Sequence, residues 1–557
     1  HQALQDIGPG GYRRGMTSRS GYDYIIVGAG SAGCVLANRL TEDAGATVLL
    51  LEAGGSDRHP YIQIPLGLGR LWQRRMFDWG YDTEPEQHLH DRRVPVRRGK
   101  VLGGSSSVNV MVYTRGHRGD FDRWAREGAT GWSYADTLPY FRRSESWEGG
   151  EDAWRGGSGP LGTQSARMDD PIDNAWREAA QRAGWPATAD LNGGEGVGVG
   201  TAQFTIHAGR RASAANAYLR PVRHRSNLTL RTGVLATRVA VRGGRAEGVH
   251  FLDHGEERHA AAGREVILCG GVFNSAQLLM LSGIGPAEHL RRIGITALAD
   301  LPVGRNLRDH LAVWLRWQRT QPGPFHHQMR LDRVAFAMAR AWLLRSGPAT
   351  TLPLGLLAFL QSEPGLEAPD LEFILSAPPF EARPWLPGWT PPFADIMGIR
   401  PVLLHPRSRG TVTLRSADPT APVRIVNNFL AEPEDLATLR RGFHLARDLA
   451  HAAPLDGFRG ALLAPGPEAR TDADIDAWIR ASAITVNHPL GTCAMGGGPD
   501  AVLEPDLRVR GIDGLRVVDA SALPDMPSAH INAIVMMLAE RAADLIRGLA
   551  PLAAANV

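Results

Sequence analysis

The sequence predicts a mixed α/β fold in which a domain on a parallel sheet is interrupted by an inserted α+β domain on an antiparallel sheet. The chain has 557 residues, more than one compact core usually holds, so two domains are expected. Apolar runs near the N-terminus alternate with a helical pattern, whereas residues 315–470 carry proline pairs and alternating polar and apolar residues. These observations together predict the two domains.

The N-terminal segment has the pattern of a β-α-β unit. Residues 24–27 are a short apolar run rich in β-branched residues, 34–40 have helical spacing, and 47–51 form a second apolar run. Strands of parallel sheets are buried on both faces and show such continuous runs. Residues 410–415 alternate instead, which is typical of an antiparallel strand exposed on one face. We therefore expect the antiparallel domain to be inserted into the parallel one.

Composition and charge exclude several classes of partner. The 61 basic and 58 acidic residues leave a net charge of +3, too small in a chain of this size to predict nucleic-acid binding. Three cysteines, Cys34, Cys269 and Cys493, lack metal-ligand spacing, so we expect no metal site and a reducing compartment. No run is apolar enough to cross a bilayer, and residues 1–20 lack a signal-peptide core. We expect a cytoplasmic protein without a transmembrane segment, with residues 1–15 outside the core.

A glycine-rich turn between the first strand and its helix predicts a dinucleotide site. Gly28 permits a tight turn, Gly30 lets backbone NH groups approach a pyrophosphate, and Gly33 lets helix and strand pack closely. Glu52 ends the second strand, nineteen residues after Gly33, where a carboxylate can bind a ribose diol. Glycines alone could serve packing only, but the complete strand, helix, strand and acid favour a dinucleotide. The motif does not choose between FAD and NAD.

Three further segments resemble the glucose-methanol-choline (GMC) oxidoreductases. They are residues 99–109, continuing through Tyr113, Gly116 and Asp122; residues 271–285, with departures at Val272 and Ala276; and residues 302–310. The resemblance implies a Rossmann-like FAD-binding domain with a substrate domain over the flavin. We assign residues 20–160, 213–314 and 476–550 to the FAD-binding domain and residues 161–212 and 315–475 to the substrate-binding domain.

The motif and the resemblance together indicate which residues contact FAD. Some relatives carry a histidine just before Asn109 that bonds covalently to the flavin, and Val108 stands there in this chain. We therefore expect non-covalent FAD. Asn109 could alternatively be a turn-capping amide and Trp72 part of a loop core. The expected contacts are Gly28, Gly30, Ser31, Ala32, Gly33, Glu52, Ala53, Trp72, Val101, Gly104, Ser105, Asn109, Val110, Met111, Val112, Ala236, Cys269, Asp519, Ala520 and Asn532.

His488 and His530 are the expected catalytic residues. In the family a histidine before Pro-x-Gly-Thr faces the flavin, and a second histidine or asparagine follows about forty residues later; here the two are forty-two apart. An imidazole with a pKa near ~6.5 is a neutral base at neutral pH and can take the proton of an alcohol while hydride passes to flavin N5. His530 would stabilise the developing alkoxide. One histidine among nineteen would otherwise be a surface or core residue.

The resemblance implies FAD-dependent oxidation of an alcohol, most simply a primary one, to an aldehyde or ketone. A lyase or a light-driven decarboxylase on the same fold, or a non-catalytic flavoprotein, are alternatives. The alcohol and the electron acceptor, oxygen or a quinone-like molecule, stay open. Asn487 stands where several relatives have an aromatic residue, which argues against a direct transfer of choline or aryl-alcohol specificity. We expect the pair Arg210 and Arg211 on a solvated face.

Overall fold

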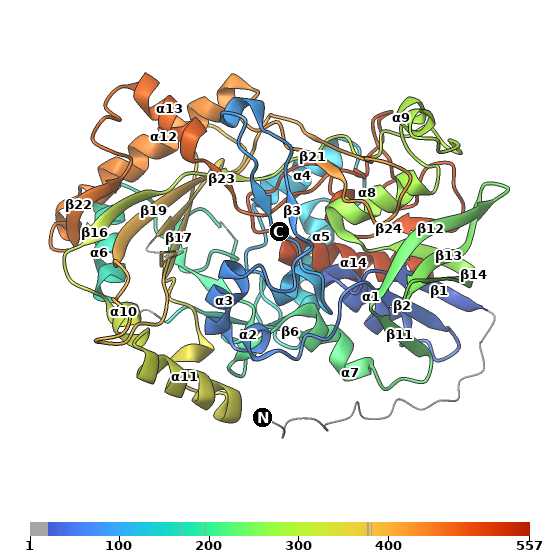
Figure 1. Cartoon of the computed structure of the whole chain (residues 1–557), viewed down its shortest axis with the longest axis horizontal. Helices are drawn as coiled ribbons and strands as arrows, with labels where there is room; N and C mark the ends of the chain where they lie inside the picture. Colours follow the sequence, from blue (N-terminus) through green and yellow to red (C-terminus); the bar gives the residue numbers. More distant parts are fainter. Residues whose placement is uncertain (1–20, 168, 195, 376–377, 380) are drawn as a thin grey trace, which may run out of the picture.

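The computed structural model describes residues 21–167, 169–194, 196–375, 378–379 and 381–557. The segment 1–15, expected outside the core, lies outside the described residues. The two largest sheets lie apart in the molecule, one near each end (Figure 1). The mixed α/β fold with a parallel sheet and a separate antiparallel sheet is confirmed.

The parallel sheet contains the β-α-β unit that the sequence predicts. Strand β1 (Tyr22–Val27), helix α1 (Ser31–Leu40) and strand β2 (Val48–Glu52) follow one another. The parallel strands lie in the order β11 (Leu228–Thr232), β2, β1, β14 (Glu256–Leu268), and β24 (Leu515–Val517) pairs with β14. Four of the five β2 residues are apolar and all are buried, as expected for a strand covered on both faces.

Long strands extend this sheet, and helices cover it. Strands β12 (Val234–Arg242) and β13 (Arg245–Asp253) continue antiparallel from β14. Helix α14 (Asn532–Arg547) packs against α1, and α8 (Gly271–Leu281) packs against β12. The first residues of all three helices line one cavity together with the last residues of β1, β2 and β14.

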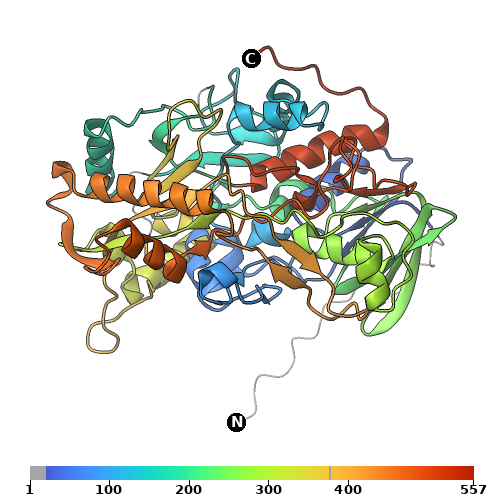
Figure 2. The same ribbon diagram turned by 90° about the horizontal axis from the view of Figure 1, so that it is seen from above.

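The second sheet is antiparallel and has the order β22 (Arg459–Ala464), β16 (Leu315–Arg319), β19 (Ile396–Leu403), β18 (Leu371–Leu375), β17 (Leu356–Leu360), β7 (Gly198–Thr201). Helix α12 (Pro433–Ala450) packs on β19 and on α13 (Asp472–Ser482). Figure 2 shows these two helices at the end of the molecule opposite the parallel sheet.

The sheets depart from the expected domain boundaries at two places. β15 (Leu311–Ala312) and β23 (Ile484–Thr485) belong to the antiparallel sheet although both fall in ranges assigned to the FAD-binding domain. Conversely, β20 (Thr411–Thr413) and β21 (Arg424–Val426) form their own hairpin, and their apolar residues join the core of the parallel domain. Short strands are placed by distant partners, so local pattern does not assign them to a domain.

The remaining elements are short or peripheral. In the first half of the chain they are α2 (Pro60–Gln63), η1 (Pro65–Gly67), α3 (Leu68–Gln73), β3 (Tyr81–Asp82), η2 (Gln87–Leu89), β4 (Pro95–Val96), η3 (Gly104–Ser107), α4 (Arg118–Arg126), α5 (Tyr134–Ser144), β5 (Glu145–Trp147), β6 (Leu161–Ser165), α6 (Pro171–Arg182), β8 (Gln203–Phe204), β9 (Ile206–His207), β10 (Arg210–Arg211), η4 (Ala215–Leu219) and α7 (Arg220–Val222). Later come α9 (Ala287–Arg292), α10 (Pro324–Gln328), α11 (Leu331–Leu344), η5 (Pro348–Thr350), η6 (Ala453–Leu455) and η7 (Ala520–Ala522). Within the described ranges, no helix is both long and apolar enough to cross a membrane.

Candidate active site

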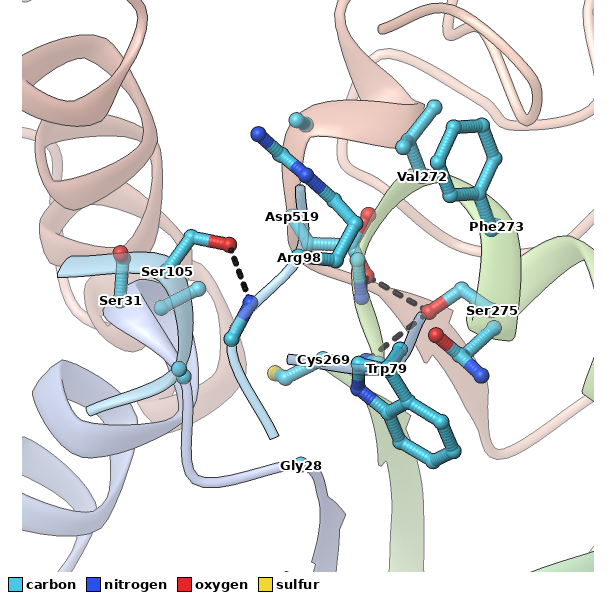
Figure 3. A pocket seen from close by; sticks show the side chains of 18 of the residues that line it. Gly28, Ser31, Trp79, Arg98, Ser105, Cys269, Val272, Phe273, Ser275 and Asp519 are labelled. Atoms are coloured by element: carbon cyan, nitrogen blue, oxygen red, sulfur yellow. Dashed lines mark hydrogen bonds between the residues drawn. The ribbon is translucent and has the colours of Figure 1, made fainter. Parts of the chain in front are cut away.

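A long cavity lies between the carboxyl ends of the parallel strands and the segment that joins β23 to the C-terminal part of the chain. Its walls come from the β1–α1 turn, the end of β2, α3, residues 97–112, β12, the β14–α8 junction, residues 486–488 and the start of α14. Figure 3 shows part of this lining, with Ser31 and Ser105 on one side and Phe273 and Ser275 on the other. Elements far apart in the sequence thus enclose one site.

The expected FAD contacts line this cavity, except for Gly33 and Val101. A Cβ on Gly33 would lie 1.9 Å from the Gly28 carbonyl oxygen, so Gly33 serves the close packing of α1 on the turn. Val101 is fully buried beside Ile62 and Leu71. Each of these two residues packs against protein, so neither lines the cavity, and their contact with FAD stays a prediction.

Helices α1 and α14 direct their N-termini into the cavity. Neither helix has a side-chain cap at its N-terminus, so backbone NH groups of the first turn stay available to a ligand. Ser31 Oγ donates to Asn532 Oδ1 at 2.8 Å, which ties the two helix starts together. Unpaired NH groups and the helix dipole favour phosphate. This end of the cavity fits the pyrophosphate of a dinucleotide.

Glu52 places a carboxylate at the same end. Its Oε2 accepts from the Ala29 NH at 2.8 Å and its Oε1 from the Gly54 NH at 2.7 Å. Burial raises the pKa of Glu52 to about 7, because the ionised form loses its hydration. A carboxylate oxygen can accept more than one hydrogen bond, so Glu52 can also receive a ribose hydroxyl.

Glycines form the floor where two loops approach each other. Gly28 has a φ of +103°, and a Cβ there would lie 2.4 Å from the Cys269 carbonyl oxygen. Gly104 has a φ of +54°, and its Cβ would lie 2.8 Å from Gly30 Cα. Side chains at these positions would force the loops apart and fill the cavity. The residues present therefore fit FAD.

Asn109 is held in place by a buried arginine. Arg211 Nη1 donates to the Asn109 carbonyl oxygen at 2.7 Å and to Asn109 Oδ1 at 2.9 Å, and its Nε donates to the Ile62 carbonyl oxygen. Arg211 is 1% exposed, so the expectation of a solvated face is wrong for it. Burial lowers the pKa of Arg211 to about 9. The carbonyl oxygens that accept hydrogen bonds from Arg211 stabilise its positive charge in this buried position.

His488 lies on the cavity wall and is oriented by His310. The two Nδ1 atoms are 3.0 Å apart, and His310 Nε2 lies 3.0 Å from the Leu404 carbonyl oxygen. A carbonyl only accepts, so His310 Nε2 carries a proton. Burial lowers the pKa of His310 to about 3, which keeps the ring neutral and its Nδ1 an acceptor. His488 Nδ1 therefore donates, and its Nε2 carries the lone pair.

His530 completes the histidine cluster. Its ring centroid lies 4.6 Å from that of His488. His530 Nε2 lies 2.8 Å from Glu372 Oε1, and its backbone NH donates to Thr114 Oγ1 at 2.8 Å. Glu372 is a buried residue of β18. The carboxylate engages Nε2, which leaves Nδ1 of His530 for a ligand.

Asn487, the residue before His488, fixes the backbone conformation of this segment. Its φ is +66°, a left-handed conformation that asparagine adopts more readily than most residues. Its Oδ1 accepts from the Arg97 NH at 2.8 Å, and its carbonyl oxygen accepts from Arg98 Nη2 at 2.6 Å. These bonds fix the segment that carries His488.

Several residues of the site had no signal as site residues in the sequence. Arg97 and Arg98 stand in a short basic run of the sequence, and both line the cavity. His310 belongs to a recognised segment, but its contact with His488 spans 178 positions. Glu372 lies in an otherwise apolar, buried strand. An acid at such a position is the one feature of the sequence that hints at a functional role.

Comparisons with known proteins agree with this geometry. Residues 22–312 and 406–539 match the GMC oxidoreductase family. Oxygen-dependent choline dehydrogenase from Rhizobium etli is 42% identical over 541 residues, which cover 96% of this chain and 97% of that protein. Pyridoxine 4-oxidase from Mesorbium loti has a TM-score of 0.82 at 32% identity, covering 94% of this chain and 98% of that chain. A formate oxidase variant from Aspergillus oryzae RIB40 has a TM-score of 0.87 at 30% identity, covering 96% and 99%. The chain belongs to the GMC oxidoreductase family and is an FAD-dependent oxidoreductase that acts on CH–OH groups.

Proposed function

We propose that the chain oxidises a neutral primary alcohol to its aldehyde, with His488 as the base that takes the hydroxyl proton. The observation that carries this is the His310–His488 hydrogen bond, because it leaves the lone pair on His488 Nε2 at the cavity wall. FAD, when bound, supplies the two-electron acceptor that takes a hydride from the alcohol carbon. The chain's own residues hold the alcohol and remove its proton.

The protonation state of His488 supports this role. Burial, with smaller contributions from His530, His310 and Arg98, places the pKa of His488 well below its ordinary value. The ring is therefore neutral at neutral pH and can accept a proton. Asp309 fixes the backbone of His488, since Asp309 Oδ1 accepts from the His488 NH at 2.8 Å.

His530 acts on the alcohol oxygen. With Nε2 donating to Glu372, Nδ1 carries the lone pair when the ring is neutral, and it can donate to an oxygen gaining negative charge when the ring carries a second proton. The carboxylate of Glu372 stabilises positive charge on this ring, so the pair favours the transition state over the neutral alcohol. Glu372 acts through His530 and is a positioning residue.

Arginine side chains at the catalytic end favour a substrate without positive charge. Arg97 and Arg98 line the cavity beside His488, and the Arg97 guanidinium lies 5.3 Å from the centre of a Trp72 ring. The carboxylates among the lining residues, Glu52 and Asp519, belong to the segments that fit FAD. At this end the described lining residues supply two guanidinium groups and no carboxylate; Asp78 lies 3.8 Å from Arg97, so Arg98 is the arginine without an acid within ion-pair distance.

We therefore expect choline to reduce the flavin more slowly than its neutral isostere, 3,3-dimethylbutan-1-ol. Like charges a few ångströms apart in a partly buried site repel by about 1–4 kcal/mol, so the difference should be at least about fivefold at subsaturating alcohol. Anaerobic stopped-flow bleaching of the flavin measures both rates. Arg97→Gln should narrow the difference, and a faster reaction with choline would contradict the charge argument.

The same anaerobic mixing tests the reaction itself. An alcohol oxidoreductase bleaches its flavin in the dark and releases one carbonyl product per flavin reduced. A lyase of this fold would convert its substrate without bleaching, and a light-driven decarboxylase would need illumination. Dark turnover of a substrate without flavin reduction would sink the proposal.

We propose that the FAD is held without a covalent bond. Val108, at the position where some relatives carry the linking histidine, lines the cavity with an isopropyl group that has no nucleophile. Acid precipitation should accordingly release the yellow flavin into the supernatant, and flavin retained on the pellet would refute this part of the proposal.

A further inference from the structure

Helix α11 (Leu331–Leu344) is apolar on both of its faces although it lies at the surface of the molecule (Figure 1). Its inner face is buried at Val334, Ala337 and Ala341. On the outside, Phe336 is 70% exposed, Leu343 75% and Leu344 70%. We call Phe336, Ala339, Trp342, Leu343 and Leu344 the outer face of α11. A helix with apolar residues all round is usually covered on every side, so an exposed face of this kind marks an interaction surface.

Arginines lie among the residues of the outer face and just beyond the end of the helix. Arg333, Arg340 and Arg345 are exposed, and Asp332, the acid of the segment 330–345, is paired with Arg330. The guanidinium of Arg210 lies 4.9 Å from the centre of the Trp342 ring and donates to the Trp342 carbonyl oxygen. The face therefore combines apolar and aromatic side chains with unbalanced positive charge. That composition is typical of helices lying in the interface of an anionic bilayer.

The length of α11 fits a helix that lies on a membrane. It has 14 residues, fewer than the roughly 17–25 needed to span the hydrocarbon core. Arginine side chains can keep their charged ends among lipid headgroups while their stems cover apolar surface. Phe336 and Leu343 lie about two helical turns apart on the same side of the helix, so they can enter the headgroup boundary together.

The position of α11 relates this surface to the cavity. Its inner residues pack with Ile64 and Leu66, which lie in the segment of α2 and η1. That segment leads directly into α3, whose Trp72 lines the cavity. A turn with the 87% exposed Trp389 follows Trp385, whose backbone pairs with the start of α11. A bilayer bound to the outer face of α11 would therefore lie beside the segment from α2 to α3, which contributes Trp72 to the cavity wall.

We propose that the outer face of α11 docks the enzyme on an anionic phospholipid bilayer. The charge and the apolar residues select this occupant over a second copy of the chain, because two copies meeting face to face would bring like-charged arginines together. The contact is interfacial and reversible, and it leaves the catalytic cavity unchanged.

Vesicle co-sedimentation of the FAD-loaded full chain tests the proposal. The probe is large unilamellar vesicles of phosphatidylcholine alone, or of phosphatidylcholine with phosphatidylglycerol. We expect binding to the anionic vesicles, weaker binding as salt rises because the Debye length shortens, and little binding to the neutral vesicles. Equal sedimentation with both vesicle types, or with none, would overturn the proposal.

Two double variants separate the contributions. Phe336→Ser with Leu343→Ser should reduce partitioning by at least about tenfold, since two large side chains no longer enter the lipid. Arg333→Glu with Arg340→Glu should abolish the preference for anionic lipid. The flavin spectrum and activity in solution should match those of the unsubstituted chain in both cases, which shows that the fold is kept.

Matched controls lie elsewhere on the surface. Leu298 is 54% exposed, and Leu298→Ser should leave vesicle binding unchanged, as should Arg242→Glu with Arg258→Glu on the β12–β14 strands. If the control variants weaken binding as much as the α11 variants do, the face is not the docking site. Sedimentation equilibrium that shows a dimer lost on Phe336→Ser would assign the face to a second copy and overturn the proposal.

Discussion

Replacing His488 by alanine should slow anaerobic flavin reduction by about 100- to 10,000-fold, the usual contribution of a positioned proton acceptor. The alcohol would then have to lose its proton to water, while the rest of the cavity stays intact. His488 lies on the cavity wall and belongs neither to the glycine turn before α1 nor to the start of α1, which fit the pyrophosphate. FAD should therefore stay bound, and its absorbance spectrum should change little.

Stopped-flow mixing of the FAD-loaded variant with a saturating primary alcohol measures this rate. His254→Ala is the matched control, because His254 is exposed on the β13–β14 turn and should leave the rate as it is. If His488→Ala with bound FAD were reduced at the unsubstituted rate, another group would have to be the base.

Replacing His310 by leucine should slow flavin reduction by about 10–100-fold, by analogy with the loss of a partner that orients a metal-ligating imidazole. Leucine fills the space but cannot accept from His488 Nδ1. The His488 ring then loses the bond that places its lone pair on Nε2. Its proton can move to the other nitrogen, which leaves no acceptor for the alcohol.

A glutamine at the same position distinguishes this orienting role from simple packing. The carbonyl of the introduced side chain could accept from His488 while its amide donates to the Leu404 oxygen, so His310→Gln should recover part of the rate that His310→Leu loses. The flavin spectrum should be the same in both variants. Equal rates for the two would mean that His310 acts by packing alone.

The FAD half of the site could be predicted from the sequence because its elements are local. Strand β1, the glycine turn and α1 follow one another within about twenty residues, so spacing alone indicates which residues meet the pyrophosphate. Apolar runs buried on both faces predict the parallel sheet, and the structure confirms it. In this half, local pattern and tertiary contact agree.

The residues that orient the catalytic histidines and Asn109 could not be predicted in this way. His310 precedes β15, Glu372 belongs to β18, and both reach the catalytic histidines through contacts between distant segments. The prediction that Arg211 is solvated failed for a similar reason. A pair of arginines usually marks a solvated surface, but the Arg211 guanidinium donates to three backbone carbonyl oxygens of other segments. No local pattern records such partners.

The pH dependence of anaerobic flavin reduction tests the central claim most directly. His488 has a pKa well below the ordinary value of 6.5, so the neutral base persists as pH falls through that value and is lost only at lower pH. The account predicts a rate constant for reduction by a neutral primary alcohol that stays level from about pH 8 to about 6 and declines only below that range. A rate constant that falls by half near pH ~6.5 or above, as an unperturbed histidine would give, would contradict it.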